Sequence, residues 1–248
     1  MNHSLLTNLI TFLFIYPLSI NSALSSNLDK ETITNQLQKG LNEKNLVLLK
    51  ELFTKESFDL FQKKYLNFAR KYKEAKWTIK KSGNDPTKKY LDIKIVSERN
   101  LDGQIYNLNS NQIIEFKTYK NKIKDYKVIS EESILKSYNS GLNIKINSPN
   151  KVLTGERYEI NLIIEEPLDN SLIASGMIAL QESGFNDISQ KYYGIKAYTS
   201  GGIFKYIQAP LKPGFQTISA LIAHPKGIYS ITKKIEVALP NDRPNFSN

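Results

Sequence analysis

The stretch SFDLFQKKYLNFARKY, residues 57–72, decides the fold prediction for the first half of this 248-residue chain. Its aromatic residues recur at steps of three and four, namely Phe58, Phe61, Tyr65, Phe68 and Tyr72. Because an α-helix has about 3.6 residues per turn, this spacing places the aromatic side chains on one face and most of the lysines on the other. The stretch therefore predicts an amphipathic helix whose aromatic face packs against a sheet.

The flanking sequence supplies the other elements of this domain. Apolar residues keep helical spacing through 29–76, and Asn45 is a candidate N-cap for a second helix. After Trp77 the period changes to two, as the alternation of apolar and polar residues over 91–95 shows. Helices followed by antiparallel strands predict an α+β domain over 29–140.

From residue 141 onward the sequence predicts only β-strands. Turn dipeptides such as Pro149-Asn150 and Pro213-Gly214 recur at short intervals and separate alternating apolar stretches. This spacing predicts a small β-sandwich over 141–239. We expect residues 240–248 to form a flexible tail.

Both halves resemble known families. The segments LVLLKELFTKESFDLFQKKYLNF (46–68) and IIEFKTYKNKIKDYKVISEESIL (113–135) resemble NTF2-like (SnoaL/ketosteroid-isomerase-shaped) domains. That resemblance implies an α+β cone, in which helices pack on a curved antiparallel sheet around a pocket. The segments INSPNKVLTGERYEINLIIEE (146–166) and LKPGFQTISALIAHPKGIYSITKKIEVA (211–238) are similar to bacterial immunoglobulin-like domains, which implies an all-β immunoglobulin-like sandwich.

The N-terminus predicts the destination of the protein. The first 25 residues, MNHSLLTNLITFLFIYPLSINSALS, contain no Lys, Arg, Asp or Glu, and an apolar run is followed by small polar residues. This pattern is typical of a secretory signal peptide over 1–25. An uncleaved anchor is the alternative, but a spanning helix needs about 20 apolar residues and Pro17 ends this run. We expect an exported protein, periplasmic or extracellular, with no transmembrane span in the mature chain.

The composition narrows the possible chemistry. The chain has no cysteine, which excludes disulfides, thiolate nucleophiles and Cys-based metal sites. His224 is the only histidine beyond the leader, which excludes multi-His metal sites and a Ser-His-Asp triad in the first domain. We therefore expect no metal, no cofactor and no catalytic residue.

The net charge of +10 is concentrated in the first domain, where 23 basic and 15 acidic side chains give +8 over residues 29–140. A basic domain attracts anionic partners. For an exported protein the expected partners are an envelope protein, an anionic polymer or a membrane surface, and nucleic acid is not expected. Abundant lysine that serves only as solvated surface is the simpler interpretation.

The NTF2-like resemblance implies pocket residues. Tyr65, Tyr72 and Tyr106 are candidates for hydrogen-bond donors in that pocket, and Asp92 is the candidate base. Strand alternation places Asp92 outward, so it would enter the pocket only if the strand register shifted by one residue.

Two surface clusters are further candidates. Lys120, Lys122 and Lys124 surround a predicted turn and could contact an anionic surface, or could protect a sheet edge against aggregation. In the second half, aromatic residues crowd around glycines at 194 and 201–202: Tyr192, Tyr193, Tyr198, Phe204 and Tyr206. Exposed, they would stack on sugars or contact a protein; pointing inward, they would be ordinary core residues.

Together these features favour an exported, non-enzymatic binding or assembly protein of the cell envelope. Two alternatives stay open. One is a small-molecule-binding protein or isomerase-type enzyme that uses the NTF2-like pocket. The other is carbohydrate or peptidoglycan binding by the β domain.

Overall fold

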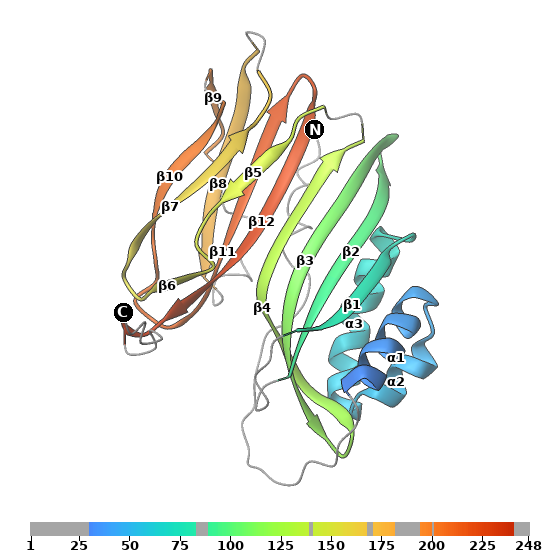
Figure 1. Ribbon diagram of the computed structural model, residues 1–248. Coiled ribbons are helices and arrows are strands. Elements are labelled where there is room, and N and C mark those ends of the chain that lie inside the picture. The colour runs from blue at the N-terminus through green and yellow to red at the C-terminus, as the bar shows by residue number, and fades with distance from the viewer. Residues whose placement is uncertain are drawn as a thin grey trace. The chain divides into compact units, whose positions relative to one another are not determined.

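The computed structural model describes residues 30–82, 89–138, 141–167, 171–181, 194–199 and 201–240 (Figure 1). These residues form two compact units that divide between Glu131 and Glu132. We name them the helical unit, which precedes the division, and the β unit, which follows it, and describe each by itself. The predicted signal peptide over 1–25 and all but the first residue of the predicted tail lie outside the described residues.

The helical unit begins with α1 (Lys30–Asn42), α2 (Leu46–Leu52) and α3 (Lys55–Lys71). The Asn45 side chain accepts a hydrogen bond from the Leu48 backbone N–H at 3.0 Å, as the predicted N-cap of α2 requires. All five aromatic residues of the 57–72 stretch are buried. The predicted helix and its buried aromatic face are therefore confirmed.

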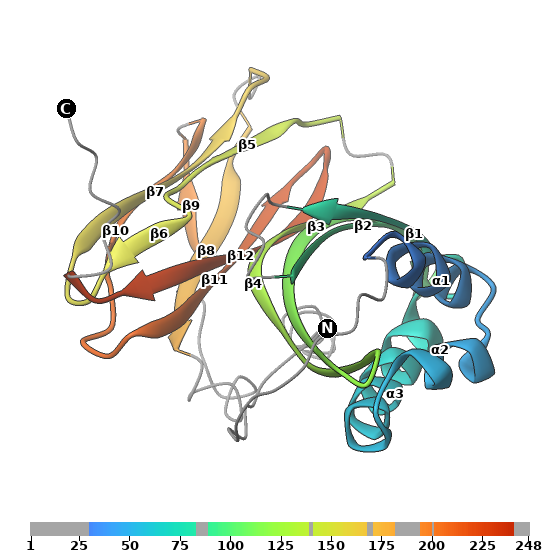
Figure 2. The same cartoon turned by 60° about the horizontal axis from the view of Figure 1, so that its bottom comes forward.

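Four strands follow: β1 (Lys76–Ser82), β2 (Lys89–Leu101), β3 (Gln104–Tyr119) and β4 (Lys122–Ser137). They lie in the order β1-β2-β3-β4 and curve, with α1, α2 and α3 beside them (Figure 2). Asp102-Gly103 and Lys120-Asn121 have positive φ at both residues, which is the geometry of a two-residue hairpin turn. The helical unit contains β4 as far as Glu131.

The β unit contains two sheets. In one, the last part of β4 is followed by β12 (Gly227–Ala238), β11 (Gly214–His224), β8 (Ile173–Gln181) and β9 (Lys196–Tyr198), while β6 (Lys151–Leu153) pairs with β12. The other has the order β10 (Gly202–Gln208), β7 (Arg157–Ile164), β5 (Ile144–Asn147). Apolar residues of both sheets form one buried cluster, including Ile160, Ile203 and Ile222. The β unit thus fits a sandwich.

The predicted fold class, an α+β cone followed by an immunoglobulin-like sandwich, is wrong for the chain. Strands contain 59% of the described residues and helices 19%, in three short elements, and the sheets are large and antiparallel. The strands extend further along the sequence than the alternation of apolar and polar residues predicts, because some inward positions carry polar residues. Ser97, Ser110 and Gln112 are buried, and each interrupts the alternation that would have extended a predicted strand.

The predicted domain limits, 29–140 and 141–239, stay a prediction. Residues 139–140 lie outside the described residues, so the boundary itself is not described. The separate stability of each half, expressed alone, is the measurement that tests it.

Candidate ligand-binding cavity and exposed surfaces

A cavity lies inside the helical unit, between its helices and the inner face of its sheet. Its volume is about 40 Å³. Its wall is almost entirely aromatic and aliphatic and combines residues from the helices and the strands: Leu37, Leu41, Phe53, Phe61, Tyr65, Trp77, Leu91, Ile93, Gln112, Ile114, Phe116, Ile123 and Tyr126. Such a lining suits a small, largely apolar ligand.

Hydrogen bonds from side chains to backbone fix the helical wall to the sheet. The Asn42 side chain accepts from the Trp77 N–H at 2.8 Å and donates to the Trp77 carbonyl oxygen at 2.9 Å. Gln38 Oε1 accepts from the Ile79 N–H at 2.7 Å. At the other end, the Thr54 N–H donates to the Ile123 carbonyl oxygen at 2.9 Å. These bonds hold α1 against β1 and the α2–α3 junction against β4.

Stacked rings form the aromatic side of the cavity. Phe61 lies between Phe53, at a centroid distance of 4.7 Å, and Tyr65, at 5.6 Å, with the rings nearly parallel. Tyr126 meets the Phe53 and Phe61 rings edge-on at 5.8 and 6.5 Å. Such offset and edge-on pairs add stability beyond the burial of their area, so this wall is preorganised.

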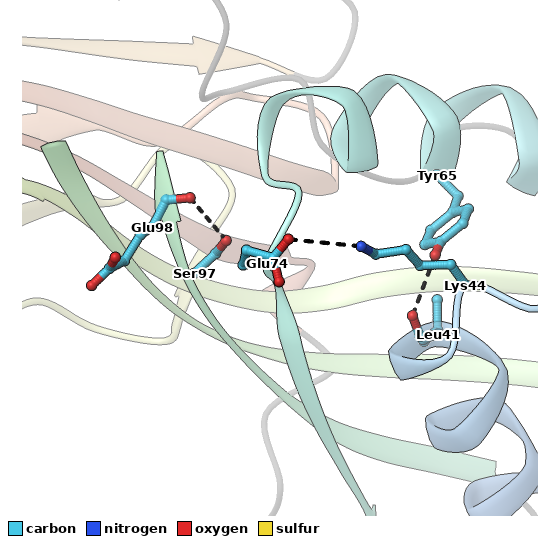
Figure 3. Close-up of polar contacts among 6 residues, drawn as sticks. All are labelled: Leu41, Lys44, Tyr65, Glu74, Ser97 and Glu98. Atoms are coloured by element: carbon cyan, nitrogen blue, oxygen red, sulfur yellow. Dashed lines mark hydrogen bonds and ion pairs between the residues drawn. The ribbon is translucent and has the colours of Figure 1, made fainter. Parts of the chain in front are cut away.

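Two tyrosines, Tyr65 and Tyr126, line the cavity, and both have a raised pKa. The Tyr65 hydroxyl donates to the Leu41 carbonyl oxygen at 3.3 Å, and burial raises the pKa of Tyr65 (Figure 3). Burial raises the pKa of Tyr126 as well, and the neighbouring Asp125 carboxylate raises it further. Both phenols therefore stay protonated at neutral pH. Beside Tyr65, an ion pair of 4.0 Å joins Lys44 and Glu74 at the surface (Figure 3).

The amide of Gln112 is the exception in this apolar lining. Gln112 lies at the middle of β3, opposite Ile93 of β2, and its side chain is 4% exposed. Within the described part of the chain, its Oε1 atom is buried and accepts no hydrogen bond. A buried acceptor without a donor costs about 1–3 kcal/mol.

Of the four predicted pocket residues, one lines this cavity. Tyr65 lines it. Tyr72 is buried beside Phe68 with the Arg99 guanidinium 5.8 Å from its ring centroid, and burial raises its pKa. The Tyr106 hydroxyl donates to Gln104 Oε1 at 3.0 Å, away from the lining. Asp92 lies on the exposed face of β2, so the register shift that would turn it inward has not occurred.

Gln112 was missed, although the sequence held a signal for it. It occupies an inward position of β3, in line with Leu108, Ser110, Ile114 and Phe116. A polar side chain in such a row marks a place where the sheet faces something other than pure hydrocarbon. Among the lining residues that the structure describes, none is a carboxylate or a histidine.

The predicted basic cluster lies at the turn between β3 and β4. Lys120, Lys122 and Lys124 are all exposed. The ammonium groups of Lys120 and Lys124 each lie 5.5 Å from the centroid of Tyr119, which is 50% exposed. The hairpin thus presents an exposed aromatic ring with two cations near it. Two of the three predicted lysines therefore lie close together, around Tyr119.

The aromatic residues predicted around the glycines of the β unit divide into three groups. Tyr192 and Tyr193 lie outside the described residues. Tyr198 is half-buried on β9, whereas Phe204 and Tyr206 of β10 point outward and are exposed.

The described residues also bear on metal binding and on membrane spanning. No group of three or more His, Cys, Asp or Glu side chains there is arranged to hold a metal ion. No helix in that same part of the chain has the length and apolar character to cross a membrane.

The fold and the cavity define a mostly β protein of two units, one of which contains an apolar cavity. A family model described as a domain of unknown function, DUF8623, matches residues 139–238, which is most of the β unit. Comparison with curated proteins gave no match. No named relative supports the NTF2-like or the immunoglobulin-like resemblance, so both stay expectations from the sequence.

Proposed function

We propose that this protein is an exported, non-enzymatic binding protein whose helical unit holds a small apolar molecule that carries one hydrogen-bond donor. The observation that carries the proposal is the unpartnered Oε1 atom of Gln112 in an otherwise apolar cavity. Export rests on the leader alone. The lack of a carboxylate or histidine among the described lining residues supports binding over isomerase chemistry.

The ligand class follows from the lining. Aromatic and aliphatic walls favour a hydrocarbon or aromatic body, because burial of apolar surface gives about 25 cal/mol per Å². Gln112 Oε1 selects a hydroxyl or amine over a pure hydrocarbon, since only a donor satisfies this acceptor.

Trp77 makes the proposal testable in the full chain. It lines the cavity and is the only tryptophan in the sequence, so its fluorescence reports on cavity occupancy. We would titrate the protein with 1-octanol and with octyl methyl ether, which lacks a donor. We expect octanol to bind about tenfold more tightly, a difference of about 1.4 kcal/mol.

Gln112→Leu should abolish this preference while it keeps the ether bound. Asn111→Leu is the matched control, because Asn111 is the exposed neighbour on the opposite face of β3. The proposal is wrong if neither probe changes Trp77 fluorescence, or if Gln112→Leu still prefers the alcohol.

A second candidate function is docking on an anionic membrane surface through the β3–β4 hairpin. The arrangement of Lys120 and Lys124 around the exposed Tyr119 favours it, because tyrosine suits the membrane–water interface and each lysine adds about 1 kcal/mol near anionic lipid. Protection of the hairpin against edge-to-edge pairing is the competing explanation.

Vesicle co-sedimentation tests this candidate. We expect binding to vesicles that contain phosphatidylglycerol and none to pure phosphatidylcholine, with loss of binding at high salt. The triple change of Lys120, Lys122 and Lys124 to Gln should weaken binding by about 100-fold. The same change at Lys76, Lys80 and Lys94, which are exposed on β1 and β2, removes equal charge and serves as the control.

A further inference from the structure

The outward face of the three-stranded sheet in the β unit carries two exposed aromatic rings. Phe204 and Tyr206 are 57% and 64% exposed and lie two residues apart on β10. Residues i and i+2 of a strand point to the same face, with about 7 Å between them. The Phe204 side chain has no polar atom, so contact with water does not favour its exposure.

Local contacts hold both rings in place. The edge of the Phe204 ring lies 3.3 Å from the position that a Cβ atom would take on Gly202, so the ring leans along the strand over a residue without a side chain. The Arg157 guanidinium lies 4.8 Å from the centroid of Tyr206 and covers one face of that ring. The exposed surface of Tyr206 is therefore its other face and its edge. Rings fixed in this way lose little entropy when something stacks on them.

Most side chains around these rings are polar, although Ile163, paired with Gly202, is an apolar neighbour of Phe204 on the same face. Across the strand pair, Asn161 is opposite Phe204, and Glu159 is opposite Tyr206. Asn147 of β5 lies beyond Asn161 on the same face, since the two are paired in register. The face thus combines two apolar rings with amide, carboxylate and guanidinium groups, and it also carries the exposed Lys145 of β5, which is paired with Ile163.

We propose that this face binds a neutral β-linked polysaccharide strand. A pyranose ring presents C–H groups on its face and hydroxyl groups around its edge. The C–H face matches Phe204 and Tyr206, and the hydroxyls match the donors and acceptors of Asn161, Glu159 and Arg157. Two cations and one carboxylate, Lys145, Arg157 and Glu159, leave little net charge on this face, which gives an anionic polymer little electrostatic attraction. The two rings are flanked by polar groups, which differs from the broad apolar core of a protein interface.

This site is independent of the cavity, because all of its residues belong to the β unit and lie within the range that the DUF8623 model matches. Failure of one proposal therefore leaves the other standing. The cavity is tested by Trp77 fluorescence with an alcohol, and the aromatic face is tested by sugar binding.

The experiment is calorimetric titration of the full chain with two tetrasaccharides, β-1,4-linked N-acetylglucosamine and β-1,4-linked glucose. We expect binding of at least one. Phe204→Leu keeps an apolar side chain and removes the ring, and should weaken binding about tenfold or more. Tyr206→Ala should do the same, whereas Phe204→Tyr should retain binding. Tyr138→Ala removes an exposed tyrosine that lies outside this face and should leave the affinity unchanged.

Three results would overturn the proposal. The first is the absence of binding to both tetrasaccharides at millimolar concentration. The second is unchanged affinity in Phe204→Leu and Tyr206→Ala, with circular dichroism confirming that both are folded. The third is a wild-type dimer that Phe204→Leu converts to a monomer in sedimentation velocity, because β10 would then be the interface between two copies of this chain.

Discussion

Two buried glutamines, one in each unit, differ in how their amides are satisfied. Gln112, in the helical unit, has a buried Oε1 atom that accepts no hydrogen bond from any described residue. Gln216, on β11 of the β unit, accepts from the Tyr158 hydroxyl at 2.6 Å and donates to the Gln208 carbonyl oxygen at 3.2 Å. The same side chain thus contributes to a closed polar network in one core, whereas in the other its carbonyl oxygen is buried without a described partner beside an apolar cavity.

This difference separates a structural role from a functional one. A satisfied buried amide fixes its neighbours, and its removal leaves their polar groups without partners. An unsatisfied one costs stability in the free protein, and under the proposed function a bound ligand would recover that cost. The β unit is expected to be the more rigid core and the helical unit the binding core.

The largest effect should come from Phe61→Ala, which removes the central ring of the cavity wall. Phe61 is buried and stacked on both sides, so the change should cost about 3–5 kcal/mol of unfolding free energy. Urea unfolding followed by Trp77 fluorescence measures it. A loss below about 1 kcal/mol would mean that neighbouring side chains repack into the space left by the Phe61 ring. The cavity wall would then not be preorganised.

Gln216→Leu should be the next largest change. It leaves the buried Tyr158 hydroxyl without its acceptor, which costs about 1–3 kcal/mol. Circular dichroism during thermal unfolding measures the loss. The double variant Gln216→Leu with Tyr158→Phe should recover part of it, because both polar groups are then gone. An unchanged melting temperature in Gln216→Leu would remove the contrast between the two glutamines.

Gln112→Leu should have the opposite sign in the free protein. Leucine removes an unsatisfied acceptor and fills similar volume, so stability should stay the same or rise by about 1 kcal/mol. The same urea experiment measures it. A clear destabilisation would show that Gln112 has a structural partner, and the main argument for a ligand would fail.

The smallest expected effect concerns alkaline pH. Burial raises the pKa of Tyr65, Tyr72 and Tyr126 in the helical unit above 10.0, the value for an unperturbed phenol. The unfolded chain therefore loses these protons at lower pH than the folded chain. Their contribution to stability is complete below pH 10 and falls as the pH rises above it.

Urea midpoints between pH 9 and 11.5, followed by Trp77 fluorescence, test this prediction. The decline should be less steep in Tyr126→Phe than in Tyr119→Phe, which changes an exposed tyrosine. Equal slopes in the two variants would mean that Tyr126 ionises as readily in the folded helical unit as in the unfolded chain.

The sequence alone determined the features that depend on neighbours along the chain. These are the helix over 57–72 with its aromatic face, the N-cap at Asn45, and the turns at 102–103 and 120–121. Helical spacing, capping and positive φ act over a few residues, so their signals survive in a single sequence.

Only the tertiary structure decided what each face of a strand meets. Alternation gives two faces but not which one is buried, and that choice depends on the pairing register and on what packs against the sheet. Gln112, which no sequence pattern singled out, therefore lines the cavity, and Phe204 and Tyr206, whose orientation the sequence left open, are exposed. The cavity is lined by residues as far apart in the sequence as Leu37 and Tyr126, which no local pattern records.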